Sequence, residues 1–308
     1  MSDVQVKSYR YLRTAMVGLL IALAAAVFYQ LWRQRFHVLS SVSAYYYTPA
    51  QAMFVGGLIG LGACMIALRG ATGFEDVGLN LGGMFAAVVA VVPTSRGADF
   101  ESAMRACQQT NTPLLTRQGS GGFDCPTVQA LIAATKANVQ NNVAALLVVG
   151  FLGLVATVLF AYSDAKAGRP RRFGVLFWWG LGASFVLWAL GFVGMLVSLD
   201  WFVHHAHFIA AIGFFVCIVA VAVANAVRRQ RPDINEHSGM RLTLGAARDV
   251  LTRRPHLYTW FVWAMLGVAG VGVALFFAGV ITLFWVEISV ALLFALFWIT
   301  QTVELRDA

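Results

Sequence analysis

The chain has 308 residues, of which 59% are hydrophobic and only 12% are charged, whereas a soluble domain carries about 25% charged residues. Long apolar runs recur along the whole length, which excludes a set of soluble domains and predicts one multi-pass membrane protein. The net charge of +8 does not point to nucleic acid as a partner, because the Lys and Arg residues lie in short segments between apolar runs.

The apolar runs are long enough to cross a bilayer as helices. In chain order they are 11–32, 50–69, 78–95, 141–163, 174–198, 205–227, 257–278 and 283–302. Only helices and closed barrels satisfy their backbone groups in lipid, and these runs are too long for barrel strands. The sequence therefore predicts an all-α bundle of about eight transmembrane helices. Most Lys and Arg residues fall on the side of the N-terminus, so both termini are expected in the cytoplasm.

The polar segment before the second run, HVLSSVSAYYYTPAQAMFVG at 37–56, is rich in hydroxyl groups. Ser43, Tyr45 and Tyr47 are expected to converge on the outer mouth of the bundle. There they could hydrogen-bond a lipid headgroup or a polar solute. In the alternative interpretation, the tyrosines form an aromatic belt at the outer membrane interface.

Small residues recur in the second and third runs. A close approach of two helix backbones would be allowed by Gly56, Gly57, Gly60 and Gly62 in the second run with Gly82 and Gly83 in the third. These two spans are therefore expected to pack tightly. Glu75 and Asp76 precede the third run. Because carboxylates are favourable at a helix N-terminus, both are expected to act as caps.

The segment 96–140 is the longest predicted outer loop and contains Cys107 and Cys125. If both termini are inside, this loop faces the oxidising periplasm. A disulfide between the two cysteines is then expected, with two free thiols as the alternative.

Three of the six histidines gather in SLDWFVHHAHFIAAIGFF at 198–215. Asp200, His204 and His207 are spaced i, i+4 and i+7 and share one helix face. With His37 from the polar segment after the first run, they could bind Zn²⁺. A haem with His37 and either His204 or His207 as axial ligands is a second possibility. The same residues could instead be interface polar groups or line a path for a solute or proton.

In the predicted inner loop 228–256, apolar residues recur at Met240, Leu244, Ala247 and Leu251, which predicts a short helix on the cytoplasmic leaflet, with a solvated connector as the alternative. Glu287 lies just inside the outer end of the last run. An ionisable group within a span indicates function, so Glu287 is expected to join Ser43, Tyr45 and Tyr47 in binding a ligand.

The runs SSVSAYYYTPAQAMFVGGLIGLG, EDVGLNLGGMFAAVVAVVPT and HHAHFIAAIGFF resemble a group of uncharacterised bacterial multi-pass proteins that share a Ser-x-Ser-x-Tyr-Tyr-Tyr motif. The chain is more distantly similar to DRAM-type membrane proteins, which implies at most a lipid-linked or membrane-organising role. A third resemblance is to intramembrane zinc hydrolases of the ceramidase and adiponectin-receptor type. That likeness implies an arrangement of Ser43, Asp200, His204 and His207 around a metal.

The leading hypothesis is a protein of the bacterial inner membrane that binds a lipid or small polar solute in an outward-facing pocket. The pocket residues would come from the groups above: Ser43, Tyr45, Tyr47, Asp200, His204, His207 and Glu287. The rival hypotheses are an intramembrane hydrolase whose Zn²⁺ activates water and a haem-binding membrane protein. Membrane lipids and a small-molecule ligand are the expected partners, and a homo-oligomer or a larger membrane complex stays open.

Overall fold

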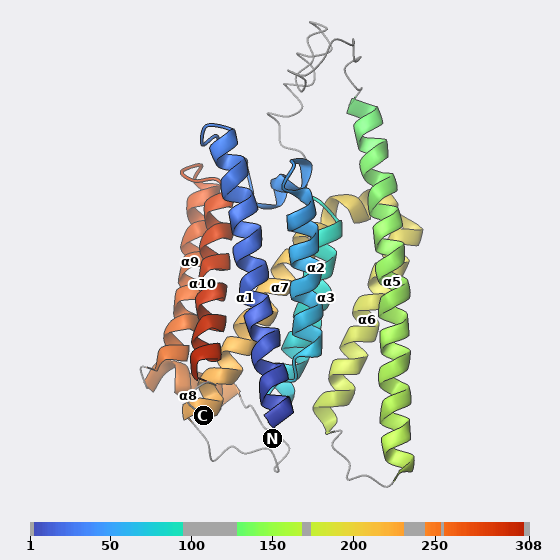
Figure 1. The fold of residues 1–308 in the computed structure, drawn as a ribbon, viewed down its shortest axis with the longest axis vertical. Helices are drawn as coiled ribbons and strands as arrows, with labels where there is room; N and C mark the ends of the chain where they lie inside the picture. The colour runs from blue at the N-terminus through green and yellow to red at the C-terminus, as the bar shows by residue number, and fades with distance from the viewer. Residues whose placement is uncertain (1–2, 95–127, 168–173, 231–243, 254–255, 305–308) are drawn as a thin grey trace, which may run out of the picture.

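The protein is an all-α bundle (Figure 1) in a computed structural model. The structure describes residues 3–94, 128–167, 174–230, 244–253 and 256–304. The elements are α1 (Asp3–Arg33), η1 (Ser43–Tyr47), α2 (Gln51–Ala67), α3 (Gly73–Val91), α5 (Val128–Lys166), α6 (Val175–Val197), α7 (Leu199–Gln230), α8 (Leu244–Arg253), α9 (Leu257–Phe277) and α10 (Leu283–Glu304).

Seven helices among the described residues are long and apolar enough to cross a membrane, which confirms the multi-pass class. The predicted span 50–69 corresponds to α2, which has 17 residues. At 1.5 Å per residue α2 is about 25 Å long, somewhat shorter than the hydrocarbon core of about 30 Å. Helix length alone thus supports seven spans rather than eight.

The predicted outer loop 96–140 is too long, because residues 128–140 belong to α5. This helix has 39 residues, or about 58 Å, and extends beyond its neighbours at one end of the bundle (Figure 1). Its first turns read ALIAATKANV, and such Ala-rich sequence favours a helix even where polar residues suggest a loop. Cys107 and Cys125 lie outside the described residues, so their disulfide stays a prediction.

In the predicted inner loop 228–256, α7 continues to Gln230 and the short helix α8 occupies Leu244–Arg253. The helix thus coincides with the segment where the apolar spacing predicted one. Its position on a membrane leaflet stays a prediction.

The centre of the bundle is α3, which packs most extensively against α7 and α2. A Cβ on Gly62 of α2 would lie 2.6 Å from the Gly83 carbonyl oxygen of α3, and a Cβ on Gly83 would lie 2.5 Å from that of Gly62. Only glycine permits so close an approach of the two backbones. The expected tight packing of these two helices is confirmed.

The pair α5 and α6 lies to one side of the bundle, while α1, α9 and α10 lie together on the other (Figure 1). Ser184 is the only fully buried residue of α6, and large apolar side chains such as Phe160, Trp179 and Val197 are exposed. In water such a surface would be unfavourable, whereas in lipid it is the expected outer face of a membrane bundle.

Both termini lie at one end of the bundle, which we call the termini end (Figure 1). The opposite end, the far end, carries η1 and the connection that leads from α1 to it. This connection also contacts the start of α10, because the backbone N–H of Phe284 donates to the Ser40 carbonyl at 3.0 Å. The far end is therefore where the predicted ligand-binding residues from three parts of the chain meet.

Candidate functional site

The 3₁₀ turn η1 positions the first of these residues. Its start is held by Ser41, whose Oγ accepts from the N–H of Ala44 at 3.0 Å, and its end by Thr48, whose hydroxyl donates to the Tyr45 carbonyl at 2.8 Å. Tyr45 is fully buried, with its ring 6.0 Å from that of Phe284. These contacts direct Ser43 toward the bundle, where it is buried.

Ser43 and His207 form a buried hydrogen-bonded pair between η1 and α7. The Nδ1 of His207 lies 2.5 Å from the Val92 carbonyl oxygen, and its Nε2 lies 3.0 Å from the Ser43 hydroxyl oxygen. A carbonyl can only accept, so Nδ1 carries the proton and Nε2 accepts from the Ser43 hydroxyl. The Val92 carbonyl is free for this bond because Pro93 follows the end of α3, where carbonyls lack helical partners.

Glu287 of α10 completes this group, which we call the far-end site: Ser43, His207 and Glu287. Its Oε2 accepts from the backbone N–H of Val42 at 2.6 Å and from that of Ser43 at 3.4 Å. Oε1 accepts no hydrogen bond from a described residue. The partly buried carboxylate is therefore fixed by one oxygen and has the other available for a ligand.

The two other predicted ligand residues lie beside this site in structural roles. The Tyr47 hydroxyl donates to the Thr94 carbonyl at 2.8 Å, which ties η1 to the residues that follow α3. Burial raises the pKa of the Tyr45 phenol, and its hydroxyl is buried without a hydrogen-bond partner among the described residues. Tyr45 is thus a neutral core residue.

The expected metal ligands do not come together. Asp200, His204 and His37 are exposed, and Asp200 instead forms an ion pair with Lys136 of α5. The Nδ1 of His204 bonds to the Asp200 carbonyl of its own helix at 2.7 Å. Within the part of the chain that the structure describes, no group of three or more His, Cys, Asp and Glu side chains is placed to hold a metal ion.

The physical reason is the exposed face of α7 for His204, since Phe202 lies further out and is buried, and depth along α7 for Asp200. Asp200 and His207 share a face, as the spacing predicted, but seven residues separate them by about 10 Å along the axis. His207 is level with η1 and the end of α3. Asp200 lies two turns further out, level with the extension of α5 that carries Lys136.

The far-end site suits binding of a polar group better than acyl transfer. A serine hydroxyl that donates to a histidine is the pairing that activates a nucleophile. However, an acyl-transfer site also needs N–H groups to stabilise the oxyanion, and here the N–H groups of Val42 and Ser43 are taken by Glu287. On Ser43, His207 and Glu287 the free groups are hydrogen-bond acceptors, whereas the Tyr45 hydroxyl beside them is a buried donor without a described partner.

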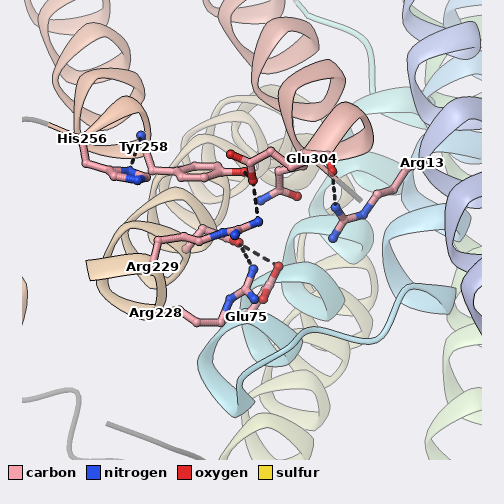
Figure 2. Close-up of polar contacts among 9 residues, drawn as sticks. Arg13, Glu75, Arg228, Arg229, His256, Tyr258 and Glu304 are labelled. Atoms are coloured by element: carbon pink, nitrogen blue, oxygen red, sulfur yellow. Dashed lines mark hydrogen bonds and ion pairs between the residues drawn. The ribbon is translucent and has the colours of Figure 1, made fainter. Parts of the chain in front are cut away.

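A second polar group lies at the termini end and is drawn in Figure 2. We call it the termini-end cluster; its members come from five helices and are Arg13, Glu75, Asn225, Arg228, Arg229, Tyr258, Gln301 and Glu304. No spacing pattern in the sequence brings these residues together.

Glu75 and Asn225 form the deepest part of the cluster. Glu75 is 1% exposed, and its Oε1 accepts from the Asn225 amide at 3.0 Å. The Asn225 Oδ1 in turn accepts from Arg228 at 3.1 Å. The Glu75 Oε2 accepts from the N–H of Ala71 at 2.9 Å, so the expected capping role at the start of α3 is also present, with the Thr72 hydroxyl as the N-cap.

A second branch of the cluster links α7, α9 and α10. One carboxylate oxygen of Glu304 accepts from Arg229 and from the Tyr258 hydroxyl, each at 2.6 Å (Figure 2). The phenol of Tyr258 is buried, while Arg229 and Glu304 are partly exposed. This branch therefore closes the cluster toward the surface.

Arg13 of α1 is the third branch. Its guanidinium donates to the Gln301 carbonyl at 3.3 Å and stacks near the rings of Tyr9 and Trp298, with 5.3 Å and 5.4 Å to the ring centroids. Arg13 is only 6% exposed. The sequence signal for this branch is a polar residue within an apolar helix, which also applies to Asn225 in VAVANAV and Gln301 in FWITQTV.

Comparison of the chain with protein-family models, with curated proteins and with solved structures finds no match. The function is therefore inferred from the two polar groups themselves.

Proposed function

We propose that this is a multi-pass protein of the bacterial inner membrane that binds the polar group of a lipid or small solute at the far-end site. In this proposal α2 is a short eighth span and both termini are cytoplasmic. Two observations support the orientation: the excess of Lys and Arg on the side of the termini, and the position of both termini at one end of the bundle (Figure 1). An even number of passes is needed to return the chain to its starting side.

The observation that carries the proposal is the state of Glu287. A carboxylate within a spanning helix is costly unless it is paired or functional. Two backbone N–H groups hold its Oε2, and no described residue bonds to its Oε1. A ligand group that donates hydrogen bonds would complete this carboxylate.

The ligand class follows from the same geometry. The far-end site offers acceptors, so it would select an ammonium or hydroxyl group and disfavour a phosphate or carboxylate. A headgroup amine such as that of phosphatidylethanolamine fits both the chemistry and the position of the site at the end of the bundle. The zinc hydrolase is not proposed, because its expected ligands lie apart.

The test compares Glu287→Gln with wild type in the retention of phosphatidylethanolamine by purified protein in neutral detergent, measured by native mass spectrometry. Glutamine keeps an oxygen for the two N–H groups, so the fold is expected to persist. The loss of the charge should weaken lipid binding about ten-fold or more, which corresponds to the 1.5–3 kcal/mol of a charged hydrogen bond.

The matched control is Asp200→Asn, which removes an exposed carboxylate at the same end of the bundle. It should retain the lipid within about two-fold of wild type, as expected for a surface charge. The proposal is wrong if both variants lose the lipid equally, or if wild type retains phosphatidylethanolamine no better than phosphatidylcholine, whose quaternary ammonium donates no N–H hydrogen bond.

A further inference from the structure

Arg13 is a buried cation that contacts no carboxylate among the described residues, although the charge of Glu75 acts on it from a distance. It forms no ion pair with any described carboxylate, although it is 6% exposed. The one hydrogen bond that it donates to a described residue runs to the neutral backbone carbonyl of Gln301, at the long distance of 3.3 Å. Because a buried charge is strongly destabilising unless it is paired, this site lacks an anion.

Unpartnered polar atoms surround the same guanidinium. The Nε of Arg13, the indole Nε1 of Trp298 and both amide atoms of Gln301 are buried without a hydrogen-bond partner. Trp298 and Gln301 are 0% and 2% exposed, and they are spaced i, i+3, on one face of α10. Buried donors are nearly always satisfied in folded proteins, so three unsatisfied N–H donors at one place indicate a missing acceptor.

The charge balance of the whole termini-end cluster also points to a missing anion. It contains three guanidinium groups, from Arg13, Arg228 and Arg229, against the two carboxylates of Glu75 and Glu304. Glu75 bonds to Asn225 and Ala71, and Glu304 to Arg229 and Tyr258. Arg13 supplies the positive charge in excess: it bonds to the Gln301 backbone carbonyl and forms no ion pair with Glu75 or Glu304 (Figure 2), although the charge of Glu75 acts on it from a distance.

We propose that the termini-end cluster binds an oxyanion, a phosphate group with a single negative charge, between Arg13 and the α10 face formed by Trp298 and Gln301. Arginine suits this group because its planar fork matches phosphate oxygens. The flanking rings of Tyr9 and Trp298 fix the plane of the guanidinium. This site goes beyond the proposed function: it uses other residues, lies at the other end of the bundle and selects the opposite charge.

The phosphate could belong to an anionic phospholipid or to a soluble phosphate compound. The experiment measures the thermal unfolding of the full chain in neutral detergent with two probes. The first probe is inorganic phosphate against chloride at equal ionic strength, and the second is phosphatidylglycerol against phosphatidylcholine in mixed micelles. Stabilisation by both probes indicates a soluble source, and stabilisation by phosphatidylglycerol alone indicates a lipid headgroup. Stabilisation by neither overturns the proposal.

Arg13→Gln should raise the concentration of the stabilising probe that gives half of its full effect by about ten-fold or more, because the charged hydrogen bonds are lost. The matched control is Arg10→Gln, which makes the same change one turn away at an exposed position of α1. It should leave this half-effect concentration within about two-fold of wild type. Equal losses in the two variants would show non-specific charge attraction and would overturn the proposal.

Because Arg13→Gln removes a buried contact and could impair folding, Gln301→Glu is the second variant. It places a carboxylate beside Arg13 and should take the role of the anion. The expected result is a higher unfolding temperature without any added probe, and no further rise with phosphate or phosphatidylglycerol. A Gln301→Glu protein that is less stable than wild type, or that still responds to the probe, contradicts the inference.

Discussion

His204 and His207 belong to one short motif and yet have opposite environments. His204 is exposed and bonds only within its own helix, whereas His207 is 3% exposed and joins α3 to η1. The sequence showed a polar stripe but not how far along the helix the surrounding bundle extends. Phe202 lies further out along α7 than His204 and is nevertheless buried. At the residue scale, then, the helix face that the bundle covers decides which histidine is part of a site.

His207→Ala is expected to destabilise the protein by about 1–3 kcal/mol, because it leaves the Val92 carbonyl buried without a partner and Ser43 without its acceptor. His204→Ala removes only an exposed contact and should change stability by about 0.5 kcal/mol or less. Thermal unfolding of both variants in the same detergent measures the difference. Equal effects would contradict the environments described for the two histidines.

At the scale of elements, two features decide how the helices sit together. Glycines of α2 and α3 allow contact of the two backbones, and α3 is thereby held at the centre between α2 and α7. The far end depends on this arrangement, because the end of α3 provides the carbonyls that fix His207 and Tyr47. The contact between α2 and α3 thus supports the far-end site from a distance.

Gly62→Ala tests this contact. The added Cβ would lie 2.6 Å from the Gly83 carbonyl oxygen, so the two helices must separate, at a cost of about 1–3 kcal/mol. Gly56→Ala, on the same helix, is the control because a Cβ there meets nothing within 4 Å. Unfolding temperatures in detergent should fall for Gly62→Ala only; no fall would show that α2 and α3 can separate without loss.

At the scale of the whole molecule, the bundle has one polar group at each end and an apolar exterior between them. The far-end site offers acceptors and the termini-end cluster offers donors. The exposed apolar surfaces of α5 and α6 are consistent with a position in lipid. Two sites of opposite preference, on opposite sides of one membrane, are the functional consequence that we propose.

The membrane topology is tested by reporter fusions. Green fluorescent protein fused after Ala308 should fluoresce, because that end is expected in the cytoplasm, where the reporter folds. Alkaline phosphatase inserted between 96 and 127 should be active, since it requires the periplasm. Five spans separate these two positions whether or not α2 crosses, so a third fusion, of green fluorescent protein before Met1, tests α2. With α2 as a span, both ends should fluoresce; if α2 does not cross the membrane, the two ends will lie on opposite sides.

Composition and hydropathy alone determined that this is a helical membrane bundle, because the need to satisfy backbone groups in lipid permits few alternatives. Local spacing also located α8, and the glycines of two consecutive spans predicted the close contact of α2 with α3. The pairing of Ser43 with His207 and the contact of Glu287 with η1 depend on segments more than a hundred residues apart. Only tertiary structure could decide these contacts, and with them the separation of Asp200, His204 and His37 from His207.

The termini-end cluster shows the same limit most clearly. Arg13, Asn225 and Gln301 are polar residues in helices that are mostly apolar, a signal that indicates a buried role but not a partner. Their assembly depends on the rotation of five helices about their axes, which is set by the shapes of the packed side chains along the whole bundle. The sequence determines that polar groups are placed in lipid; the packing of the helices decides which of them meet and which are left for a ligand.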